Sequence, residues 1–267
     1  MHATNPQLSA IRIVGAALTD AGVVRPANED NVALVLPDDP AVRIRRGVLA
    51  VVADGMGGHE GGEVASEIAA RLVPHLYYRN PGDPQEALTE AFNAANREIF
   101  EQARKRSELA GMGTTCTAVA VVNALAYCAH AGDSRAYLVR RSQAYCMTED
   151  HSATMELVKQ GLLTYADSRN HEERNVILRA MGTHKTITAA QWTPPFPMRP
   201  GDRLVLCSDG LYEMVQDHEI AEIAEANPPE EACRKLLRLA MDRVSSDNVS
   251  AVVLELCGPR DEASGKA

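Results

Sequence analysis

Four aspartates adjoin apolar runs of the sequence, and this repetition is the feature best suited to carry chemistry. The runs have the length and composition of buried strands and lie at residues 47–52, 124–130, 203–207 and 249–256. The aspartates near their ends are Asp54, Asp133, Asp209 and Asp247. One aspartate beside a glycine is usually a turn residue. A set at strand ends instead predicts a metal site with oxygen ligands, because buried charges need a partner or a cation.

The elements that would position these residues indicate an α+β fold. We expect strands at 11–18 and 30–36, helices at 63–77 and from Asp83 onward, and hairpin turns at 123 and 141–142. The second helix has a strong start signal, because Asp83 at the N-cap is followed by a proline at the first helical position and a glutamate at the third. Strands that come in hairpins, with long helices in separate blocks, favour a layered sandwich over alternating parallel units.

Composition limits the class of protein. The chain has 267 residues, 45% of them hydrophobic, and a net charge of -9, which fits one domain with a substantial core. The negative charge disfavours nucleic-acid binding, and the absence of an 18-residue apolar run predicts no membrane span. The first residues lack the features of a secretory signal. Six cysteines without a CxxC pair predict reduced core residues in the cytoplasm.

We expect one domain over residues 11–257, between a flexible segment at 1–10 and a disordered tail at 258–267. Residues 162–185 are polar and poorly periodic, which predicts a mobile flap. Three arginines, Arg43, Arg45 and Arg46, are interpreted as a solvated strand edge.

Short motifs surround the aspartates in a fixed order. They are RPANED (25–30), ADGMGGH (53–59), GTT (113–115), AGDSR (131–135), TEDHS (148–152), SDGL (208–211) and Asp247-Asn248. In this order they resemble the metal-dependent Ser/Thr protein phosphatases of the type-2C (PPM) family, and most closely its bacterial members. The resemblance implies a four-layer αββα sandwich of two antiparallel sheets flanked by helices, with a two-metal centre at one end.

The resemblance implies a role for each matching residue. Asp54 corresponds to the carboxylate that bridges both metals, and Gly55 to the residue that lends its backbone carbonyl. Asp209 and Asp247 correspond to the other ligands of the first metal. Asp133 together with Asp209 corresponds to a third, weaker metal site.

The motif at 25–30 corresponds to the second metal and to the substrate. Glu29 and Asp30 match an acidic pair that serves the second metal, one directly and one through waters; adjacent strand residues point oppositely, so either assignment stays open. Arg25 matches the arginine that grips the substrate phosphate. Many eukaryotic members carry a proton-donating histidine where this chain has Met56, so the general acid stays unassigned.

The implied activity is hydrolysis of phosphoserine and phosphothreonine in proteins by a water that two Mn²⁺ or Mg²⁺ ions activate. The expected partners are phosphoproteins, including a bacterial Ser/Thr kinase or its substrates, which the enzyme would oppose. We expect a monomer, with no nucleic-acid or membrane partner. The alternative is a catalytically weak pseudo-phosphatase, or a phospho-binding regulator of the same fold.

Overall fold

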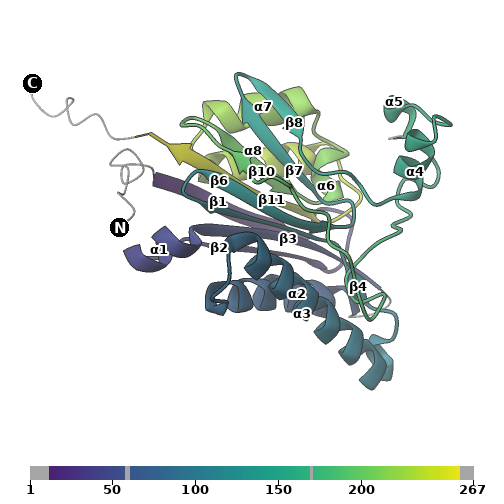
Figure 1. Ribbon diagram of the computed structural model, residues 1–267. Coiled ribbons are helices and arrows are strands. Elements are labelled where there is room, and N and C mark those ends of the chain that lie inside the picture. Colours follow the sequence, from purple (N-terminus) through teal and green to yellow (C-terminus); the bar gives the residue numbers. More distant parts are fainter. Residues whose placement is uncertain (1–11, 58–60, 169–170, 259–267) are drawn as a thin grey trace, which may run out of the picture.

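Two β-sheets face each other and helices cover both outer faces, as Figure 1 shows. The computed structural model describes residues 12–57, 61–168 and 171–258. The predicted four-layer αββα sandwich of the α+β class is confirmed. His59 of the ADGMGGH motif, residues 1–10 and most of the predicted tail lie outside the described residues. No helix within the described ranges is long and apolar enough to cross a membrane.

The first sheet has the strand order β1-β11-β10-β7-β8, and all neighbours are antiparallel. Its strands are β1 (Arg12–Asp20), β7 (Arg135–Arg140), β8 (Gln143–Cys146), β10 (Arg203–Cys207) and β11 (Val249–Cys257). The turn between β7 and β8 is the predicted one. Its two residues, Arg141 and Ser142, have φ values of 55° and 59°, as a tight hairpin requires.

The second sheet has the order β2-β3-β5-β6-β9, with a short strand beside the end of β3. Its strands are β2 (Asp30–Val35), β3 (Val48–Met56), β4 (Gly113–Thr114), β5 (Cys116–Val122), β6 (Leu125–Ala131) and β9 (Phe196–Pro197). The predicted hairpin between β5 and β6 turns at Asn123 and Ala124, whose φ values are 50° and 63°. Asp54, one of the aspartates noted in the sequence, is among the last residues of β3, where the apolar run of this strand ends.

Helices cover the outer faces of both sheets. The second sheet is covered by α2 (Gly61–Arg79) and α3 (Pro84–Lys105), and the first by α6 (Asp209–Tyr212), α7 (Asp217–Ala226) and α8 (Pro229–Asp242). The predicted cap of α3 is present, because the Asp83 carboxylate accepts from the backbone amides of Gln85 and Glu86.

Apolar clusters fill the three spaces between the layers. Along β3, Val51 packs toward α2 and α3, whereas Val52 faces the other sheet. Along β11, Val252 lies between the sheets and Val253 packs toward α7 and α8. Successive side chains of a strand point to opposite faces, and both faces are covered here. This is why the central strands are unbroken hydrophobic runs in the sequence.

The interpretation of Arg43, Arg45 and Arg46 as a strand edge is wrong. They belong to helix α1 (Pro40–Arg46), which begins after Asp39, whose carboxylate accepts from the amide of Ala41. Arg46 is buried, with its guanidinium bonded to the carbonyls of Asn80 and Gly82 and stacked over the Tyr77 ring. The capping pair Asp39-Pro40 starts a helix at this point of the chain. The residues that contact the Arg46 side chain are distant in sequence, so its burial has no local signal.

The segment predicted as a flap, 162–185, contains a short helix and, further on, a buried stretch that pairs with β4. Beside the sandwich lie α4 (Ala153–Lys159) and α5 (Tyr165–Ser168), the second of which falls within 162–185 (Figure 1). Further on, Met181 is buried and pairs with Thr114 of β4, and the amide of Gly182 donates to Oδ1 of Asn96 in α3 at 2.9 Å. A short 3₁₀ turn (Ser107–Leu109) follows α3.

Candidate active site

The fold brings the aspartates singled out by the sequence to one end of the sandwich. Asp30 and Asp54 stand opposite each other on the neighbouring strands β2 and β3. Asp209 begins the helix after β10, and Asp247 lies two residues before β11. Asp133 occupies the turn between β6 and β7. Strand ends from both sheets therefore supply the carboxylates.

Asp30 connects the two sheets at this end. Its side chain is buried, and Oδ2 accepts hydrogen bonds from the hydroxyls of Ser208 and Ser250, each at 2.7 Å. Both serines adjoin or belong to strands of the opposite sheet. Burial raises the pKa of Asp30 to about 6, and the two hydroxyl groups limit that rise.

Burial and mutual repulsion raise the pKa values of the other carboxylates. The pKa of Asp54 is well above its ordinary value, first because of burial and then because of Asp30 and Asp209. Burial and the charge of Asp133 act in the same direction on Asp209. Burial, followed by Asp150, raises the pKa of Asp133 to about 7. Such a cluster is stable in its charged form only when positive charge compensates it.

Two oxygens of the cluster have unmet bonding capacity. Oδ1 of Asp133 and Oδ1 of Asp209 are buried and lack a hydrogen-bond partner within the described part of the chain. Buried polar atoms are nearly always paired, so orphaned carboxylate oxygens are consistent with an additional cation. Among the same described residues, no three His, Cys, Asp or Glu side chains already form a metal-binding group. The donors are hard oxygens gathered at one rim, which suits Mg²⁺ or Mn²⁺ chemically.

The backbone around Asp54 is fixed by two threonines of the GTT motif. The Asp54 amide donates to Oγ1 of Thr115 at 2.9 Å, and its carbonyl accepts from Oγ1 of Thr114 at 2.9 Å. Thr115 in turn lies 2.7 Å from the Ser134 hydroxyl, next to Asp133. Thr114 belongs to β4, and Thr115 lies between β4 and β5, so both threonines adjoin the site.

Gly55 stands where three segments meet. A Cβ atom there would lie 2.2 Å from the Gly62 carbonyl oxygen and 2.5 Å from that of Glu29. No side chain fits at these distances, so the site requires glycine. The Gly55 amide donates to the Glu29 carbonyl at 3.1 Å, which draws the loop before β2 onto the end of β3.

Arg25 forms an ion pair with Asp247 at 2.5 Å (Nη2 to Oδ2). The hydrogen bond to Asp247 is the main cause that raises the pKa of Arg25. Asn248 holds this loop, accepting from the Glu29 amide at 2.8 Å and donating to the carbonyls of Ala21 and Ala27. The guanidinium therefore sits at the carboxylate rim on an anchored loop.

Comparison with known proteins identifies the family to which this chain belongs. The family described as protein phosphatase 2C matches residues 28–251, a range that holds every predicted site residue except Arg25. The chain belongs to the protein phosphatase 2C family. Its resemblance to that family, first inferred from the motifs, is confirmed.

Relatives of this protein phosphatase 2C chain include bacterial enzymes. It is 36% identical over 245 residues to the serine/threonine protein phosphatase PstP of Mycobacterium tuberculosis, covering 90% of this chain and 44% of that protein. It is 33% identical over 243 residues to the serine/threonine phosphatase stp of Listeria innocua, covering 89% and 93%. The chain therefore spans less than half the length of PstP and nearly all of stp.

The fold is also that of a solved relative. The catalytic domain of the phosphatase PstP, in complex with two manganese ions, matches this structure with a TM-score of 0.80 at 34% identity. The match covers 92% of this chain and 99% of that one.

The site of this protein phosphatase 2C chain also uses residues that the sequence did not single out. Ser250 bonds to Asp30, and its polar position within the apolar run of β11 was the available signal. His130 is buried and bonds to Thr117, and its ring stacks on His151 with centroids 4.9 Å apart. Nδ1 of His151 accepts from the Gly132 amide at 3.1 Å, next to Asp133.

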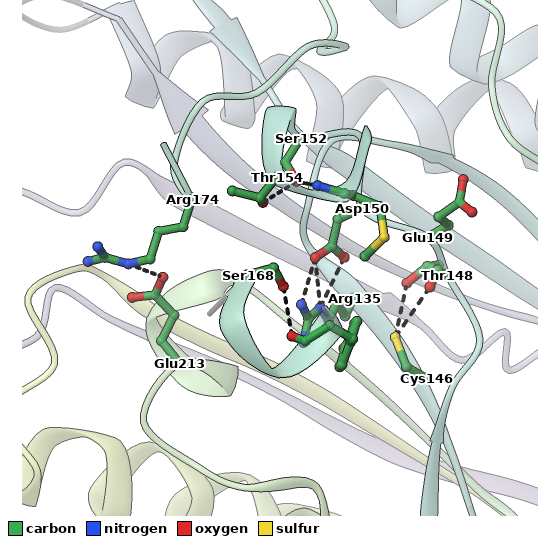
Figure 2. Close-up of polar contacts among 12 residues, drawn as sticks. Arg135, Cys146, Thr148, Glu149, Asp150, Ser152, Thr154, Ser168, Arg174 and Glu213 are labelled. Carbon is green, nitrogen blue, oxygen red and sulfur yellow. Dashed lines mark hydrogen bonds and ion pairs between the residues drawn. The ribbon is translucent and has the colours of Figure 1, made fainter. Parts of the chain in front are cut away.

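A polar cavity of about 520 Å³ lies between α4, α5 and the end of α6. Figure 2 shows Arg135 bonded to Asp150 in its wall, and Arg174 reaching from the predicted flap to Glu213. The Arg135–Asp150 pair is buried at 2.6 Å, and the Arg135 guanidinium lies 3.7 Å from the centre of the Tyr212 ring. Arg135 of the AGDSR motif is therefore a buried ion-pair partner of Asp150.

Proposed function

We propose that this chain is a protein phosphatase that hydrolyses phosphoserine and phosphothreonine with two divalent cations, Mn²⁺ or Mg²⁺. The observation that carries this is the crowding of buried carboxylates, whose raised pKa values and orphaned oxygens call for compensating cations. Membership of the protein phosphatase 2C family supports it, as do relatives named serine/threonine phosphatases.

Asp54, Asp209 and Asp247 would hold the first cation, and Asp54 would share the second with the Gly55 carbonyl. For the second cation, Glu29 is favoured as the direct ligand, because Oδ2 of Asp30 already accepts two serine hydroxyls. When bound, two such cations lower the pKa of a water between them and offset charge on the transferring phosphoryl group.

Asp133, with Asp209, would form the weaker third site. Its orphaned oxygen supports this role, since Oδ1 of both residues lacks a partner in the described structure. The Thr115–Ser134 hydrogen bond links the backbone of Asp54 to the turn that carries Asp133. The chain can thus hold all the carboxylates in a fixed relation.

Arg25 would bind the substrate phosphate. A planar guanidinium can donate two parallel hydrogen bonds to phosphate oxygens, which an ammonium group cannot match. Nη2 of Arg25 is bonded to Asp247, and a cation on Asp247 would weaken that pair. Met56 carries no proton, so the group that protonates the leaving oxygen stays unassigned.

The substrates would be phosphoproteins, and the enzyme would oppose a bacterial Ser/Thr kinase. The six cysteines are all free, which fits a reducing compartment such as the cytoplasm. Since the predicted carboxylates are all present and gather at one rim, no observation favours a pseudo-phosphatase.

Phosphate release from a phosphothreonine peptide and from 4-nitrophenyl phosphate tests the proposal. We expect both reactions with Mn²⁺, neither with excess chelator, and recovery when Mn²⁺ is restored. Peptide binding without any phosphate release at saturating Mn²⁺ would establish the pseudo-phosphatase instead.

A further inference from the structure

An apolar rim borders the candidate active site beside Arg25. Val23 and Val24 directly precede this arginine, and they are 60% and 55% exposed. Single exposed valines are ordinary on protein surfaces. Here two exposed valines directly precede Arg25, whose side chain is 48% exposed. Apolar and cationic surface therefore lie side by side.

The loop that displays these valines is anchored at several points. The side-chain amide of Asn248 donates to the carbonyls of Ala21 and Ala27, at 2.9 and 2.8 Å. Gly22 lies so close to the loop of Asp247 that a Cβ atom would be 2.6 Å from the Asp247 carbonyl oxygen. The backbone therefore holds Val23 and Val24 in an exposed position.

A third exposed valine lies on the loop that Gly22 touches. Val244 is 63% exposed and three residues before Asp247, and its φ is 59°. A β-branched residue in the left-handed region is unusual, because its Cβ crowds the backbone where glycine or asparagine would not. Strain of this kind is typical of functional positions.

We propose that Val23, Val24 and Val244 form a docking rim for phosphoproteins that carry apolar side chains next to the phosphorylated residue. The proposal rests on the proposed phosphatase function, since a phosphate held by Arg25 fixes where the neighbouring substrate residues lie. Residues of an extended substrate follow each other at about 3.3 Å, so those flanking the phosphorylated residue reach the valines beside Arg25. Contact there removes apolar surface of both partners from water.

Two phosphothreonine peptides of equal charge test the rim, one with valine and one with serine on each side of the phosphothreonine. We compare kcat/KM with Mn²⁺ for the wild type, the double variant V23S/V24S and the control Ile44→Ser. Ile44 is 67% exposed on α1, at the opposite end of β3 from Asp54. Val24→Leu, which retains apolar surface, is a second control.

We expect the wild type to prefer the valine peptide by about tenfold, the low end of discrimination by one apolar group. The double variant should lose most of this preference through a higher KM, whereas Ile44→Ser and Val24→Leu should keep it. A wild type with no preference, or a double variant that keeps it, would overturn the rim.

A binding measurement tests the docking rim independently of the proposed phosphatase activity. The same two peptides with a non-hydrolysable phosphonate are titrated with each protein and followed by fluorescence anisotropy. A binding preference that needs Val23 and Val24, in a protein that hydrolyses no phosphate ester, would overturn the phosphatase and support the rim. Equal binding of both peptides by the wild type would overturn the rim even if both are hydrolysed.

Discussion

At the scale of single residues, the ion pair between Arg25 and Asp247 joins the proposed phosphate-binding group to a proposed metal ligand. A cation bound to Asp247 would weaken this pair, because it would compete with the guanidinium for the same carboxylate. Removing Arg25 should therefore weaken substrate binding but free Asp247.

We predict that Arg25→Ala raises KM for a phosphopeptide by about 10- to 100-fold, as expected for loss of a charged hydrogen bond worth about 1.5–3 kcal/mol. Calorimetric titration should show Mn²⁺ binding that is no weaker than in the wild type. The exposed Arg45 of α1 provides the matched control, Arg45→Ala. Weaker Mn²⁺ binding with an unchanged KM would contradict the role.

For Asp54, activity and stability should move in opposite directions. Asp54→Asn should lower kcat by at least about a hundredfold, the scale of losing one transition-state stabilising group. Because burial and neighbouring carboxylates raise the pKa of Asp54, the neutral amide should stabilise the metal-free protein. Scanning calorimetry in chelator should show a melting temperature at least about 2 °C higher. The exposed Asp242, changed to Asn, is the control, and a lower melting temperature for Asp54→Asn would refute the electrostatic account.

At the scale of elements, the end of α8 is built with an unfavourable residue. The Ser245 amide bonds to the Ala240 carbonyl at 3.1 Å, a helix-ending motif whose left-handed position is usually glycine. Here that position is Val244, with a φ of 59°.

We predict that Val244→Gly stabilises the protein by about 1 kcal/mol, which corresponds to roughly 2–4 °C in melting temperature. The gain should come from removing the Cβ crowding, so Val244→Ala should give little of it. Thermal unfolding followed by circular dichroism measures both. A glycine variant no more stable than the alanine variant would show that the backbone there is unstrained.

A second prediction at this scale concerns Asn96 of α3, which holds the end of the segment predicted as a flap. Its side chain accepts from the Gly182 amide and donates to the carbonyls of His184 and Lys185. Asn96→Ala should leave buried groups unpaired and destabilise the protein by about 1–3 kcal/mol. Hydrogen exchange should accelerate at 182–185 more than in β5, and a uniform change across both would contradict local anchoring.

Elements with local signals could be predicted, and contacts between distant segments could not. The start of α3 was predicted because Asp83 caps amides within its own first turn. The burial of Arg46 was missed because its partner Gly82 is 36 residues away. Likewise, the motif order indicated Asp30, but its bonds to Ser208 and Ser250 span 178 and 220 residues. Only the folded sheets bring such groups together.

At the scale of the whole molecule, stability should depend on pH through buried groups of opposite sign. Burial lowers the pKa of His130 from 6.5 to about 4, so its contribution is complete above pH 6.5 and is lost as pH falls through 4. Asp30, whose pKa is raised to about 6, instead contributes stability at low pH that is lost as pH rises through 6. The two trends partly cancel in the wild type.

A His130→Asn variant should separate these trends. We predict that its free energy of unfolding falls less steeply than that of the wild type between pH 6.5 and 4, by up to about 3 kcal/mol over the range. Urea unfolding of both proteins at a series of pH values measures the difference. Parallel pH curves for the two proteins would show that His130 does not titrate in this way.

Asp30 and Asp54 belong to one sheet, whereas Asp209 and Asp247 adjoin strands of the other. A cation bound among them would link the two sheets of the sandwich, in addition to its part in the proposed reaction. Each tenfold excess of such an ion over its dissociation constant adds about 1.4 kcal/mol to the free energy of unfolding. When the ion is scarce, less of the protein would be folded, so the concentration of the ion would set the amount of folded protein as well as the rate of the proposed reaction.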